Sequence, residues 1–353
     1  MGRARAALNR FRAPAPGLGA VALSLSILIL SLSPSAGDPV RWMKEFPATD
    51  FSKRSVPFED IRSDGARRDS ISPITAPTFK RADKIRDIGP LEPVLSVEIG
   101  GETRAYPLRV LLWHEIVNDT IGGVPILVSY CPLCASGVVF DRRLDGTTLA
   151  FGNTGRLRHF DMIMYDHNTE SWWQQFLGEA IVGTLTGKKL KPLPSKIESF
   201  ELFRGAAPNA KVLVPAHATA RAYGTTPYVR IDSRRDKRSR FPFDIPDGVL
   251  PLERAVIVGN EAWLVERLKE KGRIEKDDLV LSWSPGQNSI HDARWIHFGR
   301  DIGNVTVQRK TDQGLEDVVY DVTFAFAFAA FRPGGTWHLG DGEATEKQED
   351  SEN

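Results

Sequence analysis

Cysteine is the scarcest reactive residue of this chain, with two among 353 residues. So few thiols exclude a fold stapled by several disulfides, and a domain of roughly 250 residues buries enough apolar surface to fold without them. An excess of one charge is also missing, because 46 basic and 45 acidic residues leave a formal net charge of +1. The basic run at 230–240 lacks interleaved aromatic residues and is interpreted as a solvated loop. We therefore expect no nucleic-acid partner.

Long apolar runs are missing beyond the N-terminus, where one spans residues 18–32. Arginines precede this run and small residues follow it, which is the order of a secretory signal. At about 1.5 Å per residue a helix of this length reaches only ~22 Å, short of the ~30 Å hydrocarbon core. We predict a cleaved signal peptide at 1–37 and export to the periplasm or the extracellular space. The mature chain would then keep no stable membrane span; an uncleaved signal anchor is the alternative.

The remaining chain divides by composition into three parts. Residues 38–81 are rich in Ser, Pro, Asp and Arg without sustained periodicity and are predicted to form an extended lead-in. Residues 339–353 are polar and acidic and are predicted to form a disordered tail. The ordered domain is therefore expected at 82–338.

Short β-like runs separated by turn residues fill this domain. Gly100–Gly101 and Asp145–Gly146 stand between such runs, and both pairs are typical of two-residue β-hairpin turns. The segment DVVYDVTFAFAFAAF at 317–331 is interpreted as a strand, and its alternation points to a two-faced sheet. The predicted fold class is α+β and β-rich, a single domain of mostly antiparallel strands with few short helices.

The two cysteines, Cys131 and Cys134, end the apolar run VPILVSY as the motif CPLC. A strand-like run, ASGVVFDRR, follows the motif, and Pro132 favours a turn. In thioredoxin-type sites a helix starts at the pair and its N-terminus lowers the thiolate pKa, a mechanism that this sequence does not provide. The pair is therefore expected on a tight connection between two strands. A structural disulfide over so short a loop would remove little chain entropy.

Long segments of the sequence resemble a known family. These are YPLRVLLWHEIVNDTIGGVPILVSYCPLCASGVVFDRR, FGNTGRLRHFDMIMYDHNTESWWQQFLGEAIVGTLTGKKLKPLPS, YGTTPY and FAFAFAAFRP. Together they closely resemble the bacterial and archaeal domain-of-unknown-function family 3179 over most of residues 83–335. The family name implies no activity. Some of its members are selenoproteins, so the resemblance implies redox chemistry at the CPLC pair.

A thiol redox protein is the first functional hypothesis. Cys131 and Cys134 would cycle between dithiol and disulfide, one attacking and the other resolving, as in a thiol–disulfide oxidoreductase. Candidate residues that stabilise a thiolate or move protons are His114, Glu115, Arg142, Arg143 and Asp161. The partner would be a redox protein or a small molecule. His114 could equally be a hydrogen-bonded structural histidine, and Glu115 a solvated surface residue.

Two further hypotheses use the same cysteines. In the first, Cys131 and Cys134 bind copper or zinc, with His114, His159 or His167 as a third ligand. In the second, the pair is a local disulfide in a non-catalytic binding module. Neither a Walker lysine at the GNTG segment nor a GxSxG motif is present, which disfavours phosphate binding and serine hydrolysis. We expect His114, both cysteines, and Asp161 or His159 to converge on one pocket.

Overall fold

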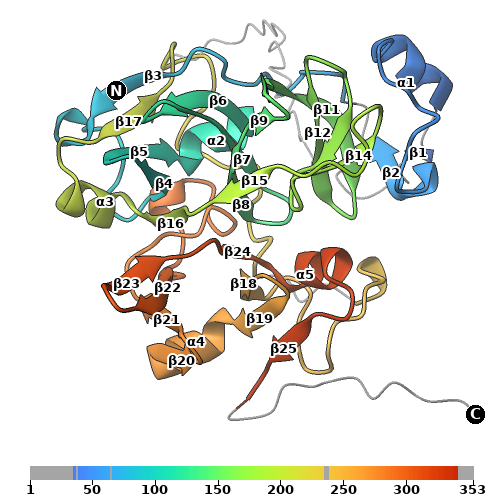
Figure 1. Ribbon diagram of the computed structural model, residues 1–353. Coiled ribbons are helices and arrows are strands. Elements are labelled where there is room, and N and C mark those ends of the chain that lie inside the picture. Colours follow the sequence, from blue (N-terminus) through green and yellow to red (C-terminus); the bar gives the residue numbers. More distant parts are fainter. Residues whose placement is uncertain (1–34, 37–38, 64–65, 234–237, 341–353) are drawn as a thin grey trace, which may run out of the picture. The chain divides into compact units, whose positions relative to one another are not determined.

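The computed structural model describes residues 35–36, 39–63, 66–233 and 238–340. Nearly all of the predicted signal peptide and acidic tail lies outside these ranges. None of the described helices is long and apolar enough to cross a membrane. Strands dominate, and the α-helices are short, as the sequence predicts (Figure 1). The α-helices are α1 (Pro39–Glu45), α2 (Leu108–His114), α3 (Phe200–Ala206), α4 (Val265–Lys271) and α5 (Ala325–Phe331).

The N-terminal strands form three larger sheets and one small hairpin. The first sheet has the order β1 (Ser35–Ala36), β2 (Ile61–Ser63), β11 (Phe151–Arg158), β12 (Asp161–Asp166), β13 (Trp172–Gln174), β14 (Glu179–Val182). The second has the order β15 (Lys191–Leu193), β8 (Ser136–Asp141), β7 (Val124–Cys131), β6 (Ile116–Ile121). The third has the order β16 (Lys196–Ser199), β4 (Pro93–Ile99), β5 (Glu102–Pro107), β17 (Lys211–Val214), β3 (Thr78–Arg81). The small hairpin pairs β9 (Arg143–Leu144) with β10 (Thr147–Thr148).

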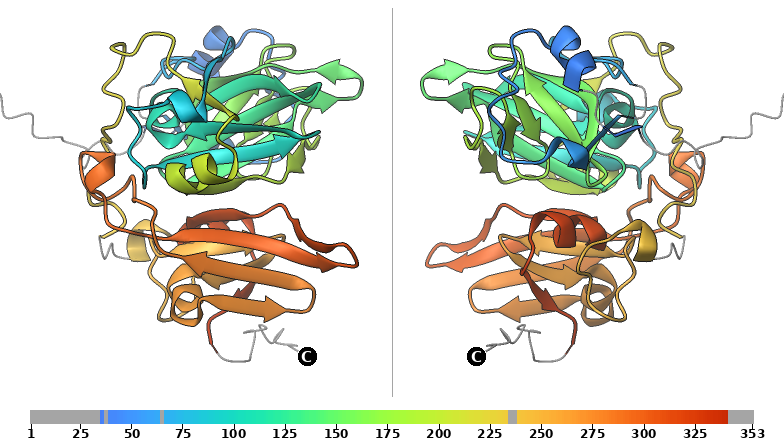
Figure 2. Two further views of the ribbon diagram at one scale, coloured as in Figure 1. Left: turned by 90° about the vertical axis from the view of Figure 1, so that its left-hand side faces the viewer. Right: turned by 90° about the vertical axis from the view of Figure 1, so that its right-hand side faces the viewer.

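The C-terminal strands form two further sheets, drawn in orange and red beneath the N-terminal strands in Figure 2. One has the order β24 (Asp321–Phe324), β18 (Arg254–Val258), β19 (Glu261–Leu264), β25 (Thr336–His338). The other has the order β20 (Arg273–Lys276), β21 (Leu279–Ser284), β22 (Asn304–Thr311), β23 (Gly314–Asp317). Among the described strands, β5–β17 and β19–β25 pair in parallel and the other ladders are antiparallel. The prediction of a β-rich, mostly antiparallel fold is confirmed.

The segment expected as an extended lead-in contributes to the packing. It carries α1, β2 and β3. The side chains of Trp42 and Phe46 are buried and pack on Trp172 with ring centroids 5.2 Å apart in both cases. These two aromatic residues provide enough apolar surface to hold the segment on the first sheet.

The prediction of a strand at 317–331 is confirmed for Asp321–Phe324, which form β24, and is wrong beyond Phe324. Residues Ala325–Phe331 form α5, and all but Ala330 among them are buried. Alternation selects a strand only when every second residue is polar, whereas Phe and Ala are both apolar. Because alanine is the best helix former and all sides of the segment are covered, the helix is the favoured state.

The largest apolar core contains both cysteines. Residues from three elements surround them: Met162 and Met164 of β12, Phe140 of β8, and Phe326 of α5. Strand β24 also contacts β8, which continues from the cysteine turn. The motif is therefore enclosed by the first sheet on one side and the C-terminal segment on the other.

Candidate functional site

The cysteine motif forms the turn between β7 and β8. Cys131 ends β7 and pairs in register with Ser136, the first residue of β8. Ala135 completes the turn in a left-handed backbone conformation with φ 59°. The predicted strand-to-strand connection is confirmed, and α2, the described helix nearest in sequence, ends at His114.

Both cysteines are free thiols and almost fully buried, with 1% and 0% of their surface exposed. Cys134 Sγ lies 3.2 Å from Asp161 Oδ1, and Cys131 Sγ lies 3.7 Å from the carbonyl oxygen of Phe160. The two sulfurs and an Asp161 oxygen all lie within 4.8 Å of one another. Asp161 is thus the predicted companion that the structure brings to the thiols.

Asp161 is a buried carboxyl group with several donors. Its Oδ2 atom accepts hydrogen bonds from Gln174 Nε2 at 2.6 Å and from the Phe176 amide at 3.0 Å. Burial nevertheless raises the pKa of Asp161 to about 6, and these donors only limit the rise. At neutral pH the group is mostly ionised but close to its pKa, so it can take up and release a proton.

The pKa values of the two thiols differ because their neighbours differ. Burial raises the pKa of Cys131, while a hydrogen bond from Cys134 favours its thiolate. Burial raises the pKa of Cys134 well above its usual value, and the charges of Cys131 and Asp161 raise it further. Cys131 is therefore the thiol that ionises more readily, and Cys134 needs a proton acceptor.

Glu115 lies near the thiols as a buried charge. Its backbone, at φ 56°, ends α2, and its Oε2 atom accepts a 2.6 Å hydrogen bond from Asn153 Nδ2. Its negative charge contributes to the raised pKa of Cys131. With 6% of its surface exposed, Glu115 is not a solvated surface residue.

The expected convergence of histidines on the cysteines is not found among the described residues. Both ring nitrogens of His114 have other partners, Nδ1 with Ser72 O at 2.8 Å and Nε2 with Tyr223 Oη at 2.9 Å. His114 is the last residue of α2, and the next residue, Glu115, has a left-handed backbone. The two side chains therefore have different partners, although the residues are adjacent in sequence. The ring of His159 packs on Phe243 and Phe331, and the ring of His167 stacks on Tyr165.

The two arginines predicted to stabilise a thiolate are engaged elsewhere. Arg142 donates hydrogen bonds to the carbonyl oxygens of Ile126, Leu149 and Asp119. Arg143 forms an ion pair with Asp141. These contacts of both guanidinium groups thus support the backbone and the surface of β8 and its hairpin. The neighbours that shift the thiol pKa values are instead acidic.

A model of the family described as "Protein of unknown function (DUF3179)" matches residues 68–335, which is more than half of the chain. The chain belongs to this family. The resemblance seen in the sequence is confirmed, and the matched range includes the cysteine turn, Asp161 and the C-terminal strands β18 to β24. No curated protein and no solved structure matches the chain.

In this DUF3179 chain the C-terminal segment holds the cysteine turn through contacts that the sequence did not reveal. His291 Nε2 donates to Pro132 O at 2.7 Å, with Nδ1 facing Arg254 at 3.1 Å. The carbonyl oxygen of Cys134 accepts from Thr323 Oγ1 at 2.5 Å and from the Phe324 amide at 3.0 Å. Such partners lie more than 150 residues away along the chain, and no sequence pattern pairs them with the motif.

Asp321 makes a second set of contacts just beyond the turn. Its carboxylate accepts from Ser136 Oγ at 2.5 Å and from the Gly137 amide at 3.1 Å. Burial raises the pKa of Asp321 to about 6, as it does for Asp161. The turn therefore lies between two carboxyl groups with raised pKa values. Asp161 contacts a thiol, and Asp321 contacts the following strand.

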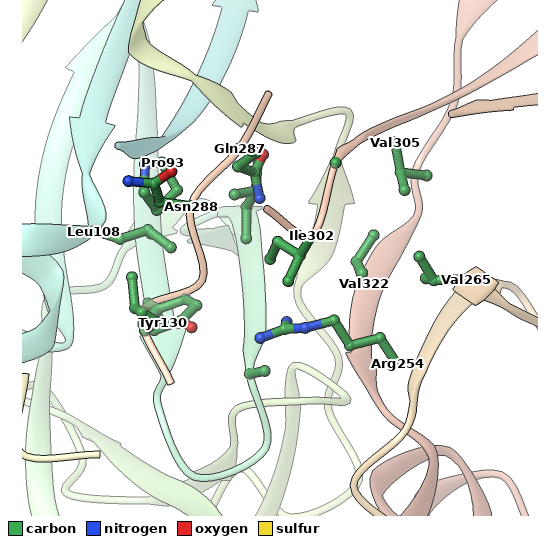
Figure 3. A pocket seen from close by; sticks show the side chains of 14 residues that line it. Pro93, Leu108, Tyr130, Arg254, Val265, Gln287, Asn288, Ile302, Val305 and Val322 are labelled. Carbon is green, nitrogen blue, oxygen red and sulfur yellow. The ribbon is translucent and has the colours of Figure 1, made fainter. Parts of the chain in front are cut away.

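A small cavity lies beside Tyr130 (Figure 3), and Ala135 of the cysteine turn belongs to its lining. The guanidinium group of Arg254 points into it toward Tyr130, with Ile302 on another wall. Its volume is about 30 Å³, which is room for about one or two water molecules. This cavity is therefore too small for a substrate.

Proposed function

We propose that this protein performs thiol–disulfide exchange with Cys131 and Cys134. The observation that carries this proposal is the 3.2 Å contact between Cys134 Sγ and the carboxyl group of Asp161, whose pKa is raised to about 6. A buried thiol with a strongly raised pKa reacts only if a neighbour accepts its proton, and a carboxylate with a pKa near neutrality is suited to that task.

The two thiols have different roles in the exchange. Cys131 attacks one sulfur of a substrate disulfide, and the other substrate sulfur leaves as a thiol. Cys134 then attacks the Cys131 sulfur of this mixed disulfide while its proton passes to Asp161, and the second substrate thiol is released. One substrate disulfide gains two electrons and two protons, and the Cys131–Cys134 pair loses the same number. The direction in the cell depends on the redox potential of the partner.

The test is single-turnover exchange with a peptide disulfide. In an Asp161→Asn variant we expect the second step to slow by about 100-fold, so that a mixed disulfide on Cys131 accumulates and is detected by mass spectrometry. Asp321→Asn is the matched control, because burial also raises the pKa of Asp321 to about 6, but its carboxylate contacts Ser136 and Gly137 rather than a thiol. Unchanged kinetics in Asp161→Asn, or the same loss in both variants, would contradict the proposed role of Asp161.

Metal binding is the second candidate function, and a separate observation favours it. The donor atoms of Cys131, Cys134 and Asp161 lie within 4.8 Å of one another, and two thiolates with one carboxylate suit zinc, or copper(I) at the sulfurs. The third ligand in this proposal is Asp161 in place of the predicted His114. Elemental analysis of the purified protein decides: one bound metal per chain, lost in Cys131→Ser, would favour this function over exchange.

Export and domain organisation complete the proposal. The basic, apolar and small-residue order of 1–37 supports a cleaved signal, and N-terminal sequencing of the mature protein from its compartment tests it. The contacts of β24 with β8 and of β16 with β22 support one folding unit over 82–338. Two separate unfolding transitions in calorimetry would contradict a single domain.

A further inference from the structure

The hairpin turn beside Cys131 has an unfavourable sequence for its conformation. Arg158 of β11 pairs with Asp161 of β12, so His159 and Phe160 are the two turn residues. Both have positive φ angles, 51° and 65°. A two-residue turn of this type prefers Asn-Gly or Asp-Gly, and bulky side chains are strained in the left-handed region. Strain retained at one position points to a local function.

Phe160 connects the buried thiol with the surface. Its carbonyl oxygen lies 3.7 Å from Cys131 Sγ, whereas 41% of the residue surface is exposed. Its ring packs on Phe241 and Phe326, with centroids 5.2 and 5.7 Å away. Cys131 itself is 1% exposed, so a reactant that approaches from this side must first meet Phe160.

A groove of about 600 Å³ opens at the same turn. Strands β2 and β11, which are neighbours in the first sheet (Figure 1), form one wall through Arg62 and Leu157. His159 and Phe160 contribute the turn, and Phe243 lies on the far wall. The volume is in the range of ligand-binding pockets, about 300–1,000 Å³. The groove therefore has the size and the aromatic lining of a binding site and ends at the residue that touches Cys131.

The charged residues of the groove balance one another. Glu59 and Asp60 supply negative charge, and Arg62 and Arg240 supply positive charge. A balanced lining gives no preference to small disulfides that carry several charges. Apolar and aromatic walls with a few polar groups instead favour a chain of neutral amides with apolar side chains.

We propose that this groove binds an extended, apolar polypeptide segment that carries the disulfide, and that Phe160 controls its access to Cys131. This proposal rests on the thiol–disulfide exchange proposed above and specifies its substrate class. The segment lies along β2 and the His159–Phe160 turn, and displacement of the Phe160 carbonyl opens the path to the Cys131 sulfur. The bond changes are those already given, with the peptide disulfide as the oxidant.

The test replaces the two ring side chains of the turn and keeps the hairpin backbone. In the double variant His159→Asn, Phe160→Gly, the residues match the preference of this hairpin, so the protein is expected to fold, as checked by thermal melting. The probe is a peptide of about eight residues, long enough to extend through the groove, with Leu and Val around one position. Two peptides are used. One has serine at that position and measures binding by fluorescence anisotropy. The other has a cysteine there, held in a mixed disulfide, and measures single-turnover exchange.

We expect the wild type to bind the serine peptide and the double variant to bind it at least about tenfold more weakly. We also expect the wild type to react with the peptide disulfide at least about tenfold faster than with glutathione disulfide, and the variant to lose this preference. Asp145→Asn in the exposed hairpin is the control and should behave as the wild type.

The outcomes separate the two proposals. Peptide binding without exchange of any disulfide would reject the exchange function and leave the groove as a peptide site. Exchange at equal rates with both disulfides, or equal peptide binding by wild type and double variant, would overturn the groove proposal and leave exchange standing.

Discussion

Two hairpin turns of this protein have nearly the same backbone and very different sequences. Asp145–Gly146 joins β9 to β10 with φ angles of 48° and 81°, and His159–Phe160 joins β11 to β12 with 51° and 65°. A Cβ atom on Gly146 would meet nothing within 4 Å, so its turn is shaped by local preference alone. The conformation of the His159–Phe160 turn is instead imposed by the residues that pack on it. This turn therefore shows how tertiary contacts override local sequence preference.

The neighbours that impose it belong to two segments, 241–243 and 321–331. Phe326 packs on Phe160, and Phe331 packs on His159. The same segment holds the cysteine turn through Asp321. The segment 321–331 thus contacts both the cysteine turn and the His159–Phe160 turn, which lie close together in space. The comparison can be tested by weakening this segment or by exchanging turn residues.

The largest effect is expected at Asp321. Burial raises its pKa from 3.8 to about 6, so the folded state holds the proton at pH values where the unfolded state has lost it. The contribution of this group to the unfolding free energy is therefore greatest below about pH 4 and is lost as the pH rises through about 6. A shift of roughly two units corresponds to about 3 kcal/mol.

The Asp321→Asn variant should remove this dependence. The amide oxygen can still accept from Gly137, and the amide nitrogen can donate to the Ser136 hydroxyl. We expect the difference in unfolding free energy, variant minus wild type, to rise by up to about 3 kcal/mol from pH 4 to pH 7. Urea denaturation at several pH values measures it. Parallel curves for the two proteins would show that Asp321 is not the group responsible.

A smaller loss is expected when the exposed turn receives the residue of the strained one. Gly146→Phe places a bulky side chain at φ 81° with no neighbour to pack against. The left-handed conformation should then cost about 1–2 kcal/mol of unfolding free energy, measured by urea denaturation at pH 7. Asp145→Asn is the control, because asparagine tolerates this conformation. Equal stability of Gly146→Phe and wild type would mean that the His159–Phe160 turn needs no support either.

Local sequence was enough to predict the strands and turns whose conformation is determined by residues a few positions away. The Asp145–Gly146 turn and the connection at Cys131–Cys134 are confirmed because apolar runs and turn residues specify them within a few positions. The family resemblance was recognised from the sequence over most of residues 83–335, and the family model matches residues 68–335. The resemblance suggested redox chemistry at the CPLC pair but no partner residues for the thiols.

The site itself depends on long-range packing that no local pattern encodes. Asp161 and His114 were both candidates, and only the fold decides that Asp161 meets Cys134 while His114 meets Ser72. Neither the contact of His291 with Pro132 nor that of Thr323 with Cys134 leaves a sequence signal. Position in the apolar core also decides the direction of the thiol pKa values, which motif spacing cannot give.

The smallest effect is expected at His159, the titratable residue of the strained turn. Burial and the positive charge of Arg158 lower its pKa to about 4, and Asp60, 3.7 Å away, opposes the shift. The unfolded state takes up a proton near pH 6.5 and the folded state only near pH 4, so stability is full above pH 6.5 and falls as the pH drops to 4. Because 22% of the side chain is exposed, solvent screening reduces the effect to about 1 kcal/mol.

The His159→Asn variant should not show this loss, so its unfolding free energy relative to the wild type should rise between pH 6.5 and pH 4. The control Asp145→Asn should show no such rise. Urea denaturation of the three proteins across this range measures the difference, and an equal decline in wild type and His159→Asn would show that His159 stays exposed enough to titrate normally in its turn.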